Sequence, residues 1–228
     1  ECQKQGITQI LHLGDYYDHR KFVNFKALNQ NRRVFLDQLR KNNMMMDIIP
    51  GNHDTYYKNT NELNSLKECL GHYMNEIHIV MEPTVMQYGS LSMGLLPWIC
   101  ADNYDQSMNF IRDCKADWLG AHLELSNFEI GRGIMAHSGM DPKLFQKFEQ
   151  VLSGHYHTAS RRDNIWYLGN PMEFFWSDAH DPKYFHILDT ETRQIEKIKN
   201  TYTLFEKIVY NDKEMDYNNY NKNLSKKF

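Results

Sequence analysis

Short apolar runs that stop abruptly at a polar cluster recur along the chain. Four of them end in a short polar cluster that contains aspartate, asparagine or histidine; they are 7–13, 44–49, 118–121 and 151–152. A short apolar run bounded in this way is typical of a buried strand. Open α/β sheets place their sites at the carboxyl ends of strands, so these polar clusters are the first candidates for chemistry.

Helical patterns and a hairpin lie between these runs. The predicted helices are 24–41, 62–70 and 103–114, of which the first has apolar residues near helical spacing. Gly89 and Ser90 separate two strand-like segments, 84–88 and 91–96, which predicts a hairpin. The alternation of strand and helix indicates an α/β fold.

The last third of the chain has a different texture. Short strand-like segments joined by turns are predicted at 165–168, 183–188 and 193–198. We expect them to form a second sheet packed on the first, which gives an α/β two-sheet sandwich flanked by helices. Residues 1–200 are assigned to this domain. Residues 201–228 are expected to be a tail or the start of a further C-terminal region, because 211–228 is rich in Asn, Lys and Tyr with little apolar periodicity.

Composition favours a soluble globular protein with no membrane segment. The chain has 228 residues, of which 41% are hydrophobic and 24% charged, and no apolar run approaches the roughly 18 residues that cross a bilayer. Its four cysteines form no CxxC pair, which favours free thiols and a cytoplasmic location. The net charge of -3 provides no general attraction for nucleic acid, so any DNA contact must come from local patches and bound cations.

Four elements at the ends of apolar runs follow one another in a fixed order. They are Gly14-Asp15-Tyr16-Tyr17-Asp18, Gly51-Asn52-His53-Asp54, His122 and Gly154-His155-Tyr156-His157. In this order they resemble the motifs of the calcineurin-like metallophosphoesterase superfamily. One four-residue motif would be weak evidence, but several in order, each after an apolar run, make coincidence a poor explanation.

The resemblance implies a centre of two divalent cations. Asp15 would bridge the two ions, and His157 would bind one of them. The shell of the other ion would be completed by Asn52, His122 and His155. His53 would be the catalytic histidine that stabilises or protonates the leaving oxygen. The chemistry agrees, since paired cations need a shared carboxylate with neutral nitrogen and oxygen ligands around it, and such a pair activates water and neutralises phosphoryl charge.

Some neighbouring residues have competing interpretations. Asp54 is expected outside the ligand shell, where it would orient His53 or cap the following segment. For Asp18, a turn or helix cap is as good an explanation as a functional role. His137 is the alternative to His122 if the alignment at the third motif has slipped. The histidines that match no motif are taken as surface or core residues; they are His12, His72, His78, His180 and His186.

Within the superfamily, the chain is most similar to the SbcD-type nuclease subunit and its tailed-phage counterpart, the recombination endonuclease subunit. Protein phosphatases of the superfamily carry GDxxDRG and GNHE, whereas this chain has His19 before Arg20 and Asp54 in place of the glutamate. The likeness ends near residue 200 and runs through 15–21, 50–58, 96–100, 120–125, 153–158 and 188–192.

This likeness implies a DNA exonuclease and endonuclease of recombination, repair and replication. Its cofactor would be Mn²⁺, with Mg²⁺ as the alternative, and its partners an SMC-like ATPase subunit of the SbcC type and a second copy in a homodimer. A phage-encoded member would work in the host cytoplasm. Arg20 and Lys21, beside the first metal loop, are the candidate phosphate contacts, whereas other basic pairs are taken as solvated.

Two other functions fit the same scaffold. One is a phosphatase or cyclic-nucleotide phosphodiesterase, and the other is a non-catalytic scaffold that binds a partner. His53 argues against the scaffold, which has no need of that side chain.

The family opens with a strand that ends in Asp-x-His, and this motif is not found here. We therefore expect the domain to lack its first strand and two ligands of the ion that His157 binds. The consequence would be one tight and one weak metal site, with impaired activity in the chain as given.

Overall fold

The strands of the described residues form two sheets and two hairpins. The computed structural model describes residues 2–131 and 133–207. The first sheet is parallel, in the order β1 (Gln9–His12), β2 (Met45–Ile48), β3 (Ile77–Ile79). The second has the order β10 (Ser160–Arg162), β11 (Ile165–Tyr167), β9 (Gln150–Gly154), β6 (Trp118–His122), β5 (Leu91–Leu96), β4 (Thr84–Tyr88). The hairpins are β7 (Glu129–Gly131) with β8 (Ile134–Met135), and β12 (Tyr184–Leu188) with β13 (Ile195–Lys199).

The helices begin at side-chain caps that the sequence supplies. The helix predicted at 24–41 is confirmed as α1 (Phe25–Asn31), a π-helical turn η2 (Arg32–Leu36) and α2 (Asp37–Lys41), and the Asn24 side chain accepts the first amides. The helix predicted at 62–70 begins later, as α3 (Ser65–Leu70), because Asn64 caps it by accepting the amide of Lys67. The third is α4 (Tyr104–Asp113). Short 3₁₀ turns are η1 (Cys2–Gln5), η3 (Gly71–Tyr73), η4 (Pro142–Phe145) and η5 (Trp176–Asp178).

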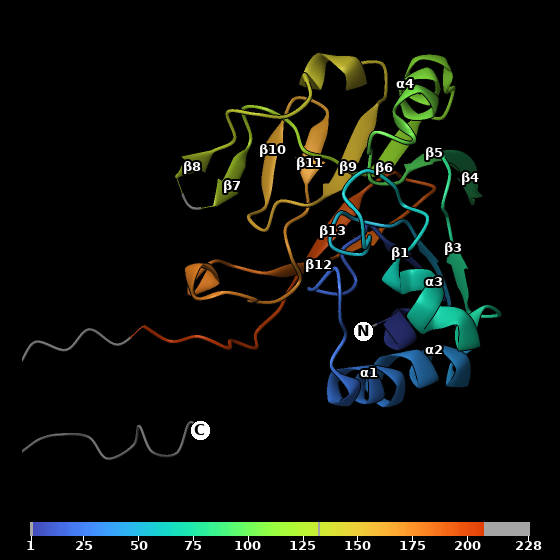
Figure 1. Ribbon diagram of the computed structural model, residues 1–228, viewed down its shortest axis with the longest axis vertical. Coiled ribbons are helices and arrows are strands. Elements are labelled where there is room, and N and C mark those ends of the chain that lie inside the picture. Colours follow the sequence, from blue (N-terminus) through green and yellow to red (C-terminus); the bar gives the residue numbers. More distant parts are fainter. Residues whose placement is uncertain (1, 132, 208–228) are drawn as a thin grey trace, which may run out of the picture.

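Three apolar clusters define four layers, helix, sheet, sheet and helix. One packs α2 and α3 on the first sheet through Leu39, Leu66 and Ile48. The second lies between the sheets, and hairpin β12–β13 contributes Leu188 and Ile195 to it. The third covers the outer face of the second sheet with α4 and η4. Figure 1 shows α1 to α3 beside β1 to β3, and α4 at the opposite side. The predicted α/β two-sheet sandwich flanked by helices is confirmed.

The strands that carry motifs are divided between the two sheets. β1 and β2 belong to the first sheet, whereas β6 and β9 are neighbours in the second. The prediction that the strand at 165–168 belongs with the C-terminal strands was wrong, because β11 pairs in parallel with β9. Burial explains this pairing, since Tyr167 is fully buried and its hydroxyl group donates to the carbonyl oxygen of Leu123 at 3.0 Å.

A buried carboxylate joins the sheets. Asp47 of β2 accepts hydrogen bonds from Gln9 of β1 and from the hydroxyl group of Tyr88 of β4, both at 2.7 Å, and His78 of β3 lies 3.0 Å away. These bonds fix how the sheets are stacked, and with it how their loops meet. In the described part of the chain, no helix has the length and apolar character needed to cross a bilayer. The predicted tail at 211–228 lies outside the described residues.

Candidate metal centre

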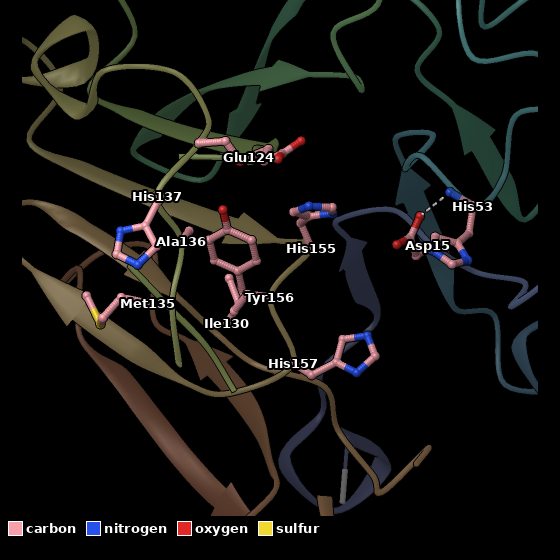
Figure 2. A pocket seen from close by; sticks show the side chains of 11 residues that line it. Asp15, His53, Glu124, Ile130, Met135, Ala136, His137, His155, Tyr156 and His157 are labelled. Atoms are coloured by element: carbon pink, nitrogen blue, oxygen red, sulfur yellow. Dashed lines mark hydrogen bonds between the residues drawn. The ribbon is translucent and has the colours of Figure 1, made fainter. Parts of the chain in front are cut away.

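Loops from both sheets bring four polar side chains together. Asp15 follows β1, Asn52 follows β2, His122 ends β6 and His155 follows β9. Candidate ligand atoms of Asp15, His122 and His155 all lie within 4.8 Å of one another. Figure 2 shows Asp15, His53, His155 and His157 at one end of a pocket of about 740 Å³. The sandwich therefore assembles one site from motifs that are distant in sequence.

His122 turns a bare nitrogen toward Asp15 and Asn52. Its Nδ1 lies 2.7 Å from the carbonyl oxygen of Leu13, so that nitrogen donates its proton there. In the neutral ring, Nε2 then has a lone pair, and it lies 3.2 Å from Oδ2 of Asp15 and 3.0 Å from Oδ1 of Asn52. Three acceptors face one another, which is an arrangement that a cation or an added proton stabilises.

His155 completes the group. Its Nδ1 lies 2.9 Å from the same Oδ1 of Asn52. The set therefore offers a carboxylate oxygen, an amide oxygen and two imidazole nitrogens, a mixture that suits Mn²⁺ and its first-row neighbours. The residues present thus fit a divalent cation.

The charges of Asp15 and His155 are those that metal binding requires, whereas at His122 a cation would compete with a proton. Burial raises the pKa of Asp15, but the neighbouring His122 ring and the amide of His53 outweigh it and lower the value to about 2. Burial and the neighbouring His122 lower the pKa of His155 to about 3. For His122, burial is outweighed by Asp15, which raises the pKa. At neutral pH, Asp15 is therefore ionised and His155 is neutral.

Two of these residues have strained backbones. Asp15 and His155 have φ angles of 56° and 84°, and such left-handed conformations cost non-glycine residues about 1–3 kcal/mol each. Asp54 stabilises the left-handed backbone of Asp15. Its buried carboxylate accepts the amides of Asp15 at 2.7 Å, Tyr16 at 2.9 Å and Gly51 at 2.8 Å. Strain at Asp15 is thus offset by charge-assisted hydrogen bonds.

This contact corrects the expectation for Asp54. Its carboxylate does not orient the His53 ring but ties the Asp15 loop to the Gly51 loop. The ring is held by Asp18, whose carbonyl oxygen lies 2.5 Å from Nδ1 of His53. The amide of His53 donates to Oδ1 of Asp15 at 2.7 Å. Asp18 thus contributes through its backbone.

Glycine is required where these loops touch. A Cβ atom at Gly51 would lie 2.2 Å from Oδ1 of Asp15, and one at Gly14 would lie 2.6 Å from Nδ1 of His122. No other residue fits at such distances without moving a candidate ligand.

The chain is similar to a known exonuclease subunit. No family model matches the chain. Over 219 residues, however, it is 33% identical to exonuclease subunit 1 of Enterobacteria phage T4. The chain is therefore similar to that phage exonuclease subunit over nearly its whole length. The alignment covers 96% of this chain and 64% of the phage protein. A solved structure of an archaeal phosphodiesterase has 15% identity and a TM-score of 0.43, covering 87% of each chain.

In this chain, His157 and His137 lie outside the group around Asp15. His157 lines the same pocket, and its ring is stacked on Phe175 at 5.6 Å. His137 is exposed and lines the other end of the pocket, so the structure brings His122 and not His137 to Asp15 (Figure 2).

The basic pair contacts the loop that follows His53. Arg20 donates through Nη1 to the carbonyl oxygen and the hydroxyl group of Thr55, at 3.3 and 3.1 Å. Lys21 places its Nζ 5.5 Å from the centre of the Tyr56 ring. Both cations thus contact the loop that follows His53.

Two residues near the centre were not predicted. Trp98 packs its ring 5.8 Å from His122 and 5.4 Å from His155, and its only sequence signal was its place in the likeness at 96–100. His12, taken as an ordinary histidine, is half-buried beside the site; desolvation and the charge of His122 lower its pKa to about 4. Neither belongs to a motif, so only their contacts identify them.

Proposed function

We propose that the chain is the catalytic part of a metal-dependent DNA nuclease, the exonuclease and endonuclease subunit of a recombination and repair complex. The observation that carries this proposal is the convergence of three acceptors, with Nε2 of His122 3.2 Å from Oδ2 of Asp15 and 3.0 Å from Oδ1 of Asn52. The relationship to a phage protein named as an exonuclease subunit supports DNA as the substrate.

The cofactor in this proposal is a pair of divalent ions, Mn²⁺ or alternatively Mg²⁺. Asp15 serves both ions, while Asn52, His122 and His155 serve one of them and His157 the other. When bound, the ions activate water and neutralise the charge that develops on the phosphoryl group. The low pKa values of Asp15 and His155 keep them ready to bind at neutral pH.

His53 acts on the leaving oxygen in this scheme. Its Nδ1 is bound to the carbonyl oxygen of Asp18, which fixes the plane of the ring and leaves Nε2 for the substrate. Only the doubly protonated ring can donate a proton from Nε2 while Nδ1 keeps its contact. Arg20 and Lys21 would bind a flanking phosphate.

The partners and location follow the same proposal. An SMC-like ATPase subunit of the SbcC type would control access to DNA ends, in the cytoplasm of a host cell if the chain is phage-encoded. A homodimer is supported by apolar side chains exposed on and beside α1, since Phe25 is 87% and Val34 73% exposed.

Three substrates test the proposal. The Mn²⁺-loaded protein would be incubated with linear duplex DNA, an aryl phosphodiester and a cyclic nucleotide. We expect the wild-type protein and the exposed-site control His72→Gln to cleave DNA. Asp15→Asn should not cleave it. Turnover of the small substrates without DNA cleavage would favour the phosphodiesterase alternative, and metal binding without any turnover would favour a scaffold.

A further inference from the structure

Three consecutive aromatic side chains next to His157 are exposed to solvent. Phe174, Phe175 and Trp176 are 49%, 48% and 57% exposed. They lie in the segment between β11 and β12, which we call the aromatic loop (residues 172–178). Figure 1 shows this segment, in orange around η5, projecting from the body of the protein. Adjacent rings that are exposed to solvent lack the free energy that their burial would provide. Such exposed apolar groups mark a surface that binds a ligand.

The loop is held from beneath by buried charges. Asp178 is 5% exposed, and its Oδ2 accepts the amides of Phe174 at 2.8 Å and Phe175 at 3.0 Å. Lys183, 4% exposed, donates to Oδ1 of Asp178 at 3.3 Å and to the carbonyl oxygen of His157 at 3.1 Å. The backbone of the loop and that of His157 are therefore parts of one hydrogen-bonded network.

A second buried carboxylate fixes the other side of the loop. Glu173 is 3% exposed and accepts the amides of Leu204 at 2.5 Å and Phe205 at 2.9 Å. The Phe205 ring then meets Trp176 edge-on at 5.7 Å. The backbone is thus tied down at both ends while the rings stay accessible, which is the design of a preorganised binding surface.

The rings adjoin the proposed metal centre. His157 stacks on Phe175 at 5.6 Å with 4° between the planes, and it meets Phe174 edge-on at 5.9 Å. His157 also lines the pocket that contains Asp15 and His53. A phosphodiester bound in that pocket would have its neighbouring nucleoside beside these rings.

We propose that the aromatic loop binds an unpaired nucleobase next to the scissile phosphodiester, by stacking on Phe174 and Trp176. The proposal rests on the proposed function, since it names the part of a DNA substrate that this surface recognises. Bases within a duplex are already stacked on one another, so the loop favours frayed ends and single strands. Aromatic stacking does not depend on base identity, and we therefore expect no sequence preference.

The choice of variants follows from the contacts. Phe175 is left intact, because its ring supports His157. Trp176→Ala and Phe174→Ala remove exposed rings, and Trp176→Phe restores a ring at the same position. Tyr104→Ala, on α4, is the matched control, because Tyr104 is an equally exposed aromatic residue at 50%. Mn²⁺ uptake measured by calorimetry checks that each variant is folded.

Fluorescence anisotropy with Ca²⁺ in place of Mn²⁺ would measure binding of a single-stranded oligothymidylate and of an abasic oligonucleotide of the same length. We expect Trp176→Ala and Phe174→Ala each to bind oligothymidylate about tenfold more weakly than wild type. Wild type should bind the abasic strand about tenfold more weakly than oligothymidylate. The two alanine variants should bind both strands with similar affinity. Trp176→Phe and Tyr104→Ala should bind as wild type does.

Unchanged affinity for oligothymidylate in both alanine variants would overturn the stacking proposal. An equal loss of affinity for both oligonucleotides would also overturn it, because that result indicates a backbone contact or a protein-docking surface. The proposed function fails in a different way. In that case wild type binds neither strand, whether or not it hydrolyses an aryl phosphodiester, and both proposals fall together.

Discussion

Nε2 of His122 lies 3.2 Å from Oδ2 of Asp15, and Nδ1 of the same ring is occupied by the carbonyl oxygen of Leu13. The ring is almost completely buried, so no water shell can satisfy this nitrogen from another side. An imidazole that is tethered through one nitrogen and directed by the other at a carboxylate is a preformed half of a metal site.

Asp15→Asn should therefore abolish tight metal binding. The substitution keeps the shape of the side chain but removes the charge that attracts the cation. Loss of a residue that only supports a ligand lowers metal affinity by about 10–100-fold, so we expect loss of the Asp15 charge to lower Mn²⁺ affinity by at least about 100-fold. Titration calorimetry would measure it. Asp18→Asn is the control, because its exposed side chain can change while its carbonyl oxygen stays on His53. Equal affinities in the two variants would exclude Asp15 as a ligand.

The two metal sites should differ in affinity. Asp15, His122 and His155 are grouped within 4.8 Å, and Asn52 lies among them, whereas His157 lies outside this group. We expect the 228-residue chain to bind one Mn²⁺ tightly and a second at least about tenfold more weakly, because the second ion has fewer ligands. Calorimetry that finds two equal tight sites would contradict this division of ligands.

His53→Ala should separate chemistry from metal binding. The side chain contacts the carbonyl oxygen of Asp18 and not the group around Asn52. Loss of a general acid costs about 10²–10⁴-fold in rate, so DNA cleavage should fall by this factor while Mn²⁺ affinity stays close to that of wild type. Rate assays and calorimetry on the same preparation would test both points. A variant with full activity would remove His53 from the mechanism.

Acid should destabilise the metal-free protein in part through His186. Burial, with a smaller effect of Lys197, lowers the pKa of His186 to about 4, against about 6.5 in an unfolded chain. Because the folded-state pKa is the lower one, the stabilisation is complete above pH 6.5 and is lost as the pH falls toward 4. Partial exposure of the ring reduces the loss to about 1 kcal/mol.

Urea unfolding in EDTA at pH 7 and pH 5 would measure this effect. His186→Phe keeps an aromatic ring against Trp166, which the histidine meets edge-on at 5.4 Å, but it removes the titrating group. We expect this variant to lose less stability than wild type on acidification, while His72→Phe, at an exposed position, should behave as wild type. An identical loss in all three proteins would show that His186 has no part in it.

Charges on α1 should weaken self-association. Phe25 and Val34 are the most exposed apolar side chains of α1 and η2, and a glutamate at either position would place an unpaired charge in a dimer interface. We expect Phe25→Glu with Val34→Glu to raise the dimer dissociation constant by about 100-fold or more, as measured by analytical ultracentrifugation. The exposed apolar residue Leu144 is the control site. A wild-type chain that stays monomeric at high concentration would contradict the homodimer.

The sequence by itself determined the elements and the candidate ligands. Apolar runs, asparagine caps and the Gly89 turn act within a few residues, so the longer strands, the helices and the β4–β5 hairpin could be predicted from local pattern, whereas the short strands β3, β7, β8 and β10 were not. The order of the motifs likewise identified Asp15, Asn52 and the histidines, because each motif is a contiguous stretch of chain.

Only the tertiary structure decided how these pieces meet. His122 and Leu13 are 109 residues apart in the chain, and whether His122 or His137 faces Asp15 depends on how two sheets stack. The role of Asp54 and the exposure of the aromatic loop have the same origin. Burial and contact between distant segments are set by packing of the whole sandwich, and no local pattern contains that information.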